Sequence, residues 1–313
     1  MRRLVRVVRT ALGRWSDDKA PKMAAALAFY SSFALAPLLF IAISIAGLVF
    51  GQDAAREGVV AQIQGLIGEG SARAVDDILQ RVSEPKTGTL ASIAGLLALF
   101  FGASGVFAEL QDSLNVVWKV KKKPGRGLLG TVKDRFLSFT MVLGLGFLLL
   151  VSLVVSAALA ALGELIGGAD AGILLKALSF LFSLSVVTAL FTLMFRFLPD
   201  ARTRWTEALA GGAITAFLFT LGKFAIGAYL GQGTVATTYG AAGAFLLVLL
   251  WVYYSSQILF LGAEVTKAYA DLRGHAPAPD PDAVPAEDAR AGPARRPRPA
   301  EIVIELGGRR RRR

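Results

Sequence analysis

Six long apolar stretches constrain the fold of this chain more than any other feature of its sequence. They are Ala24–Phe50, Leu90–Leu110, Phe136–Leu162, Ile173–Phe197, Ala208–Leu230 and Ala241–Leu261. About 20 helical residues, at about 1.5 Å each, cross a hydrocarbon core of about 30 Å, so each stretch is long enough to span a bilayer. With 54% hydrophobic residues, a soluble fold would lack the polar surface to cover such a core. We therefore expect an all-α, polytopic membrane helical bundle with six transmembrane helices.

Lysine and arginine residues are concentrated in alternate connections between these stretches. Of the 34 basic residues, 28 lie in residues 1–23, in or directly beside the second and fourth connections, or after the last stretch. Positive charges beside a span tend to stay in the cytoplasm, so both termini are predicted to be cytoplasmic. The net charge of +11 is explained by this face and its attraction to anionic headgroups. We accordingly expect membrane lipids, and no specific nucleic acid, as partners.

The chain divides into three regions. Residues 1–23 form a basic amphipathic cytoplasmic segment, residues 24–272 the six-span membrane domain, and residues 273–313 a Pro/Arg-rich cytoplasmic tail. The tail holds seven of the twelve prolines and is predicted to be disordered because it cannot bury a core.

Two segments outside the spans have helical periodicity. One face of the N-terminal segment carries Leu4, Val8, Leu12 and Trp15, which predicts a helix lying on the inner leaflet, with a disordered basic leader as the alternative. The external connection, residues 51–89, predicts two short amphipathic helices. These helices would form either a structural cap or a docking surface for an envelope protein partner.

The sequence contains no familiar catalytic or cofactor motif. A phosphate-binding loop, a serine nucleophile elbow and an H-E-x-x-H zinc motif are all missing, as are cysteines, and the single histidine, His275, lies in the tail. We therefore expect a protein that is not an enzyme and that has no cofactor and no metal site.

Polar residues within the spans are the first candidates for a substrate path, since they are costly at membrane depth. Lys223 lies in the outer half of the fifth span, where it would meet an anionic substrate, pair with Glu164, or extend to the interface. Pro37 is predicted to kink the first span, and Gln257 adds a polar group to the sixth.

A second group of candidates lies at the cytoplasmic ends of the spans. Glu109, Asp112 and Asn115 share one helix face, and Glu264 lies near the end of the sixth span. Arg135 and Arg196 are candidate charge partners. Together these residues would form either an ion-binding vestibule or ion pairs that hold helices together.

The chain resembles the YihY/virulence factor BrkB family of bacterial inner-membrane proteins over about residues 10–272. The resemblance rests on Ala26–Phe40 (ALAFYSSFALAPLLF), Glu109–Trp118 (ELQDSLNVVW), Arg196–Pro199 with Trp205, and Gly222–Val252 leading through Tyr239–Gly240 to Gly262–Glu264 (GAE). It implies six spans, a large first external loop, location in the bacterial inner (plasma) membrane, and no settled activity. Members have been labelled permeases and once ribonucleases. The ribonuclease label does not suit a chain that has neither a metal-binding carboxylate cluster nor a histidine outside its tail.

These observations favour a translocator of an amphiphilic or anionic envelope lipid. A non-transporting scaffold for envelope machinery is the main alternative, and a small-solute permease is a weaker one.

Overall fold

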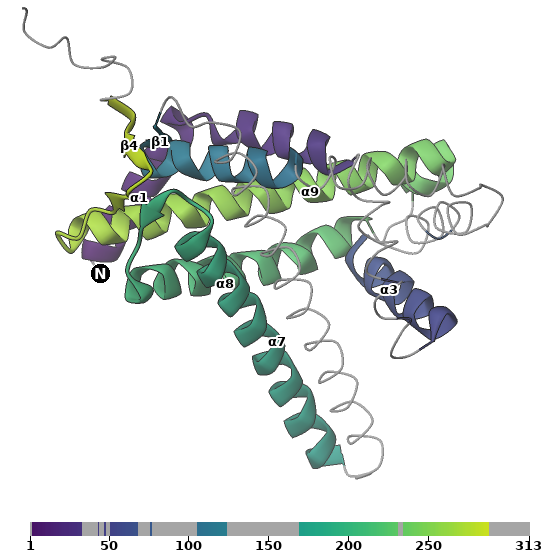
Figure 1. Ribbon diagram of the computed structural model, residues 1–313. Helices are drawn as coiled ribbons and strands as arrows, with labels where there is room; N and C mark the ends of the chain where they lie inside the picture. Colours follow the sequence, from purple (N-terminus) through teal and green to yellow (C-terminus); the bar gives the residue numbers. More distant parts are fainter. Residues whose placement is uncertain are drawn as a thin grey trace, which may run out of the picture.

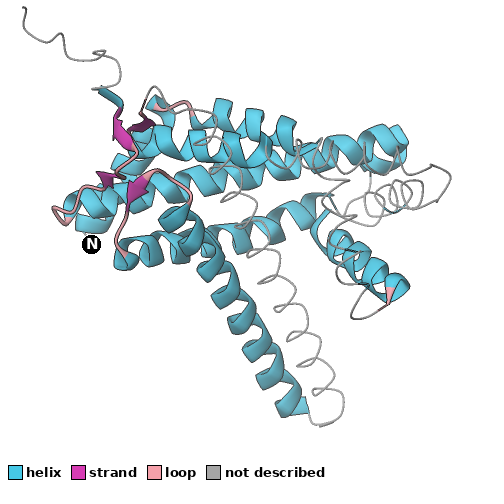
Figure 2. Ribbon diagram, in the orientation of Figure 1, coloured by secondary structure: helices cyan, strands magenta, loops and turns pink. Residues whose placement is uncertain are grey.

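The computed structural model describes residues 2–32, 43, 47, 51–67, 76, 105–123, 169–230 and 234–287. The labelled helices are α1 (Arg2–Asp17), α3 (Gln52–Ile67), α7 (Ala169–Phe197), α8 (Trp205–Leu230) and α9 (Thr234–Leu272). Residues 20–32 and 105–118 are also helical. The strands are β1 (Val120–Lys122), β2 (Ala201–Arg202), β3 (Ala278–Pro279) and β4 (Ala283–Pro285). The fold is therefore mostly helical, as expected, but it is not all-α (Figure 2).

The predicted fourth, fifth and sixth spans lie within α7, α8 and α9. Two helical segments among the described residues, Ala177–Phe197 and Phe245–Leu272, are long and apolar enough to cross a membrane. The predicted third span lies outside the described residues, and only parts of the first and second lie within them. The count of six spans therefore stays a prediction.

Large apolar side chains are exposed along these helices. They include Leu178, Phe180 and Leu181 on α7, Ile214, Phe217, Leu221 and Phe224 on α8, and Phe245, Leu246 and Leu250 on α9. Soluble monomers rarely expose so many large apolar groups on neighbouring elements. This surface fits helices that face lipid.

The buried core lies at the end of the molecule that carries α1, where the start of α8, the end of α9 and the strands gather (Figure 1). Leu114 and Trp118 pack there with Phe195 of α7 and Phe260 of α9. We call this region the α1 end.

Helix α1 packs along the last turns of α9. Val7 and Ala11 of α1 are buried against Val265 and Ala268 of α9, so the alternative of a disordered leader is wrong for residues 2–17. Val8 and Leu12 of the predicted apolar face are exposed. They remain available for contact with a lipid surface.

Helix α3 lies where the external connection was predicted to be helical. It is a single helix of 16 residues, and a bidentate hydrogen bond from Arg56 reaches Asp76 at 2.6 and 2.8 Å. Apart from Asp76, the second predicted helix of this connection lies outside the described residues.

The predicted disorder of the tail is wrong for residues 273–287, which are ordered. β3 pairs antiparallel with β2, and β4 pairs antiparallel with β1. Prolines suit such short, extended edge pairings because each strand needs to donate few amide hydrogens. Composition could not predict this order, because the partners are strand edges supplied by two other connections of the chain. The remainder of the tail, residues 288–313, lies outside the described residues.

Candidate functional site

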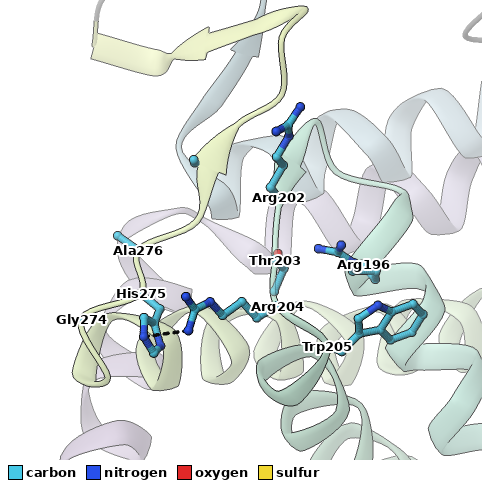
Figure 3. Close-up of a pocket in the computed structure, with 9 residues that line it drawn as sticks. Arg196, Arg202, Thr203, Arg204, Trp205, Gly274, His275 and Ala276 are labelled. Atoms are coloured by element: carbon cyan, nitrogen blue, oxygen red, sulfur yellow. Dashed lines mark hydrogen bonds between the residues drawn. The ribbon is translucent and has the colours of Figure 1, made fainter.

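An open pocket of about 550 Å³ lies at the α1 end, between the α7–α8 connection (residues 198–204) and the segment that follows α9 (Figure 3). We call it the arginine pocket. Its lining residues are Arg196, Arg202, Thr203, Arg204, Trp205, Gly274, His275, Ala276 and Ala278. None of these lining residues is acidic.

Local sequence explains the position of the α7–α8 connection. Pro199 cannot continue α7, which ends at Phe197. Buried Thr203 accepts a hydrogen bond of 2.9 Å from the Trp118 indole. The Asn115 side chain makes two hydrogen bonds to Asp200: its amide N–H donates to the carboxylate at 2.7 Å, and its amide oxygen accepts from the backbone N–H at 2.8 Å. The connection is thus anchored to residues 105–118.

The opposite wall of the pocket is positioned by the end of α9. Gly274 has φ of +73°, and the N–H groups of Gly274 and His275 donate to the carbonyls of Asp271 and Ala270, both at 3.0 Å. This is the Schellman arrangement that terminates helices at glycine. It turns the chain so that His275 faces the start of α8.

His275 joins two groups of opposite charge. Its Nε2 lies 2.8 Å from Nη1 of Arg204, and its Nδ1 lies 3.1 Å from Oε1 of Glu207. A guanidinium only donates hydrogen bonds, so Nε2 must accept. The hydrogen of a neutral imidazole then resides on Nδ1 and is donated to Glu207, whose side chain is 1% exposed. We call this arrangement the Glu207–His275–Arg204 relay.

Glu207 has a second role at the start of α8. Its Oε2 accepts a hydrogen bond of 3.3 Å from the backbone N–H of Arg204, as the third residue of a helix does in a capping box. The start of α8 and the orientation of Arg204 therefore depend on the same carboxylate.

The two other arginines of the pocket differ in how they are held. Arg202 donates from Nε to Asp280 at 3.1 Å. The Arg196 guanidinium lies over the Trp205 ring, 5.6 Å from its centroid. Its Nε is buried without a hydrogen-bond partner in the described part of the chain.

Most of the predicted polar residues at this end are packed against other elements. Asn115 has the structural role just described. Desolvation raises the pKa of Asp112, opposed by the charge of Lys122 and reinforced by that of Asp200. Glu109 is partly buried, and its candidate partner Arg135 lies outside the described residues.

Glu264 is fully buried. Its carboxylate lies beside the side chains of Asp18, which directly follows α1, and of Lys267. Lys267 donates to the Val117 carbonyl at 2.7 Å. Glu264 therefore lies within the α1–α9 contact region and does not line the arginine pocket.

Of the predicted candidates within the spans, Lys223 and Gln257 lie among the described residues. Lys223 is half-buried on α8, next to Gly222, which packs closely against Tyr254 of α9. Gln257 is partly buried, and its Oε1 has no partner in the described ranges. Pro37 and Glu164 lie outside these ranges, so the Lys223–Glu164 pair stays a prediction.

Sequence reasoning identified Arg196 but did not identify Arg202, Arg204, Glu207 and His275 as site residues. The signal was present in two places, as a cluster of arginines before α8 and as the only histidine of the chain. Nothing in the linear order joined them, since Arg204 and His275 are 71 positions apart.

The mostly helical fold, with two membrane-length helices and an exposed apolar surface in its described part, fits a helical membrane protein. The sequence model of the family described as virulence factor BrkB matches residues 11–287. The chain belongs to this family.

Similar curated proteins carry the name UPF0761 membrane protein. One from Methylibium petroleiphilum is 30% identical over 275 residues, which cover 84% of this chain and 62% of the relative. One from Azotobacter vinelandii is 32% identical over 262 residues, covering 80% and 60%. The chain therefore spans about three fifths of the length of these relatives. No solved structure matches this chain.

Proposed function

We propose that this protein translocates an amphiphilic or anionic envelope lipid across the bacterial inner membrane. The observation that carries the proposal is the position of the arginine pocket beside exposed apolar side chains. Phe197 and Trp205 lie edge to face with ring centroids 5.6 Å apart, and both are more than half exposed. A molecule with an anionic head and an apolar chain would satisfy both surfaces at once.

The proposal includes a topology. In it, six spans cross the membrane, both termini are cytoplasmic, and the arginine pocket opens at the inner leaflet. The basic residues of the second and fourth connections support this orientation. Membrane lipids are the proposed partners, no chemical reaction is required, and residues 51–89 would face the envelope.

Topology is tested with single cysteines, because the chain has none of its own. A membrane-impermeant thiol reagent added outside should label Ala72→Cys and Gly168→Cys but not Gly125→Cys or Ala278→Cys. Outside labelling of Gly125→Cys would overturn the orientation.

Transport is tested with purified full-length protein in vesicles that carry a fluorescent anionic lipid in one leaflet. We expect the protein to accelerate movement of this lipid between leaflets. Arg196→Gln should reduce the rate, whereas Arg9→Gln, which removes an exposed charge from α1, should not. If no labelled lipid moves, this proposal is overturned, and the scaffold alternative, in which residues 51–89 dock an envelope protein partner, replaces it.

A further inference from the structure

We infer that the arginine pocket binds a phosphate group, with Arg196, Arg202 and Arg204 as its donors and a phosphate-bearing lipid as its ligand. This inference rests on the proposed function and names the chemical class of its substrate.

The lining of the pocket carries positive charge and many hydrogen-bond donors. Three guanidinium groups line it, and no carboxylate does. Arginine presents a planar fork of N–H groups that matches two oxygens of a phosphate at once. A carboxylate has only two oxygens and is satisfied by one such fork. A tetrahedral phosphate, which offers oxygens in several directions, suits a pocket with three arginines better.

Arg196 is the donor least satisfied by the protein itself. Among the described residues it has no ion-pair partner, and its buried Nε has no acceptor. Its guanidinium lies over the Trp205 ring, and a cation–π contact uses no hydrogen-bond acceptor, so the terminal N–H groups are free to donate. A ligand oxygen in the pocket would be an acceptor for its terminal N–H groups.

Arg204 is oriented before any ligand arrives. The Glu207–His275–Arg204 relay occupies Nη1, and the other nitrogens of this guanidinium have no partner in the described ranges. Because the relay sets the rotamer of Arg204, little side-chain entropy is lost when a phosphate binds. His275 is a positioning residue in this arrangement.

Arg202 contributes a more adaptable charge. Asp280 engages only its Nε, and its side chain is 64% exposed. The two terminal nitrogens are therefore available to a ligand that enters from the open side of the pocket.

The neighbouring surface indicates where the phosphate comes from. Exposed Phe197 and Trp205 continue into exposed Leu209 on α8, which offers apolar contact to an acyl chain. Inorganic phosphate would use the same arginines but would gain nothing from this surface.

The experiment measures binding to the full-length protein in maltoside micelles, which contain no phosphate. The probes are dioleoyl phosphatidic acid, dioleoyl glycerol and inorganic phosphate. We expect phosphatidic acid to bind at least tenfold more tightly than either of the other two. Equal binding of phosphatidic acid and dioleoyl glycerol would overturn the inference. If inorganic phosphate binds as tightly as phosphatidic acid, the phosphate site is supported and the lipid source is overturned.

Variants assign the binding to the pocket. Loss of one charge-assisted contact should weaken phosphatidic acid binding about 10- to 100-fold in Arg196→Gln and Arg204→Gln. Arg196→Lys keeps the charge but loses the fork, so it should lie between Arg196→Gln and the unchanged protein. Arg9→Gln is the control and should bind normally. Unchanged affinity in both glutamine variants would place the ligand elsewhere and refute the inference.

The result separates the inference from the proposed function. Specific phosphatidic acid binding without lipid movement in vesicles upholds the phosphate site and overturns translocation. Lipid movement that is equally fast for phosphate-free lipids, and unaffected by Arg196→Gln, upholds translocation and overturns the phosphate site. Thermal unfolding of each variant in the same detergent identifies any loss of affinity that follows from misfolding.

Discussion

The contact between α8 and α9 should not tolerate an added methyl group at Gly262. Gly262 of α9 lies against Thr215 of α8, and Gly211 of α8 lies against Thr266 of α9. Each threonine hydroxyl donates to the carbonyl of the glycine four residues earlier on its own helix, at 2.7 and 2.8 Å. The two Gly-x-x-x-Thr segments thus interlock in opposite directions, and the small residues allow the backbones to approach closely.

The structure sets the magnitude of this effect. A Cβ atom at Gly262 would lie 1.8 Å from Oγ1 and 2.8 Å from Cβ of Thr215, well inside the 3.4 Å at which ordinary contacts begin. Rotating Thr215 away would break its bond to Gly211, costing about 1 kcal/mol, and would not remove the Cβ contact. Overpacking adds about 1–3 kcal/mol, while alanine in place of glycine gains about 1 kcal/mol in helix propensity. We expect Gly262→Ala to lower the free energy of unfolding by about 1–3 kcal/mol.

The assay is equilibrium unfolding of purified protein in mixed detergent micelles. Gly13→Ala is the matched control, because a Cβ at Gly13 of α1 meets nothing within 4 Å and should stabilise α1 by up to about 1 kcal/mol. Adding Thr215→Ala to Gly262→Ala should recover part of the loss. If Gly262→Ala is as stable as the Gly13→Ala control, the close packing of α8 and α9 is refuted, and with it the contact that holds Arg204 near His275.

Three further predictions concern the site. His275→Ala leaves Arg204 Nη1 without its acceptor and Oε1 of buried Glu207 without a donor, so binding of phosphatidic acid should weaken severalfold and stability should fall by about 1–3 kcal/mol; normal binding in titrations would show that the relay does not position Arg204. Asn115→Leu removes both bonds to the α7–α8 connection and should cost about 2–4 kcal/mol in an unfolding titration, which an unchanged transition midpoint would contradict. Lys223→Met should express and fold normally, because loss of a charge at membrane depth relieves a desolvation cost. Transport should nevertheless fall, since the charge that would meet an anionic substrate is lost; a stable, fully active variant would end the functional claim for Lys223.

Several parts of the fold could be predicted from the sequence. The apolar stretches at Ile173–Phe197 and Ala208–Leu230 match α7 and α8 closely, because long helices in an apolar environment are specified by local composition. The helical periodicity of the N-terminal segment and of the external connection was confirmed in α1 and α3.

The candidate site was predicted less well, for a physical reason. Glu109, Asp112 and Asn115 share one helix face by spacing alone, but spacing could not show that Asn115 holds the α7–α8 connection. Burial of Glu264 in the α1–α9 contact region likewise depends on a helix that precedes it by more than two hundred residues.

Membrane character and the bounds of the long helices follow from apolar runs that each residue shares with its near neighbours, so the linear order of amino acids suffices to specify them. The arginine pocket depends on contacts between distant segments. The Schellman turn at Gly274, the pairing of β3 with β2 and the packing of α8 on α9 together bring His275 to Arg204. The Pro/Arg-rich composition predicted disorder for the same tail segment. That prediction failed for residues 273–287 because the strand edges and the buried carboxylate that hold this segment exist only once the helices have packed.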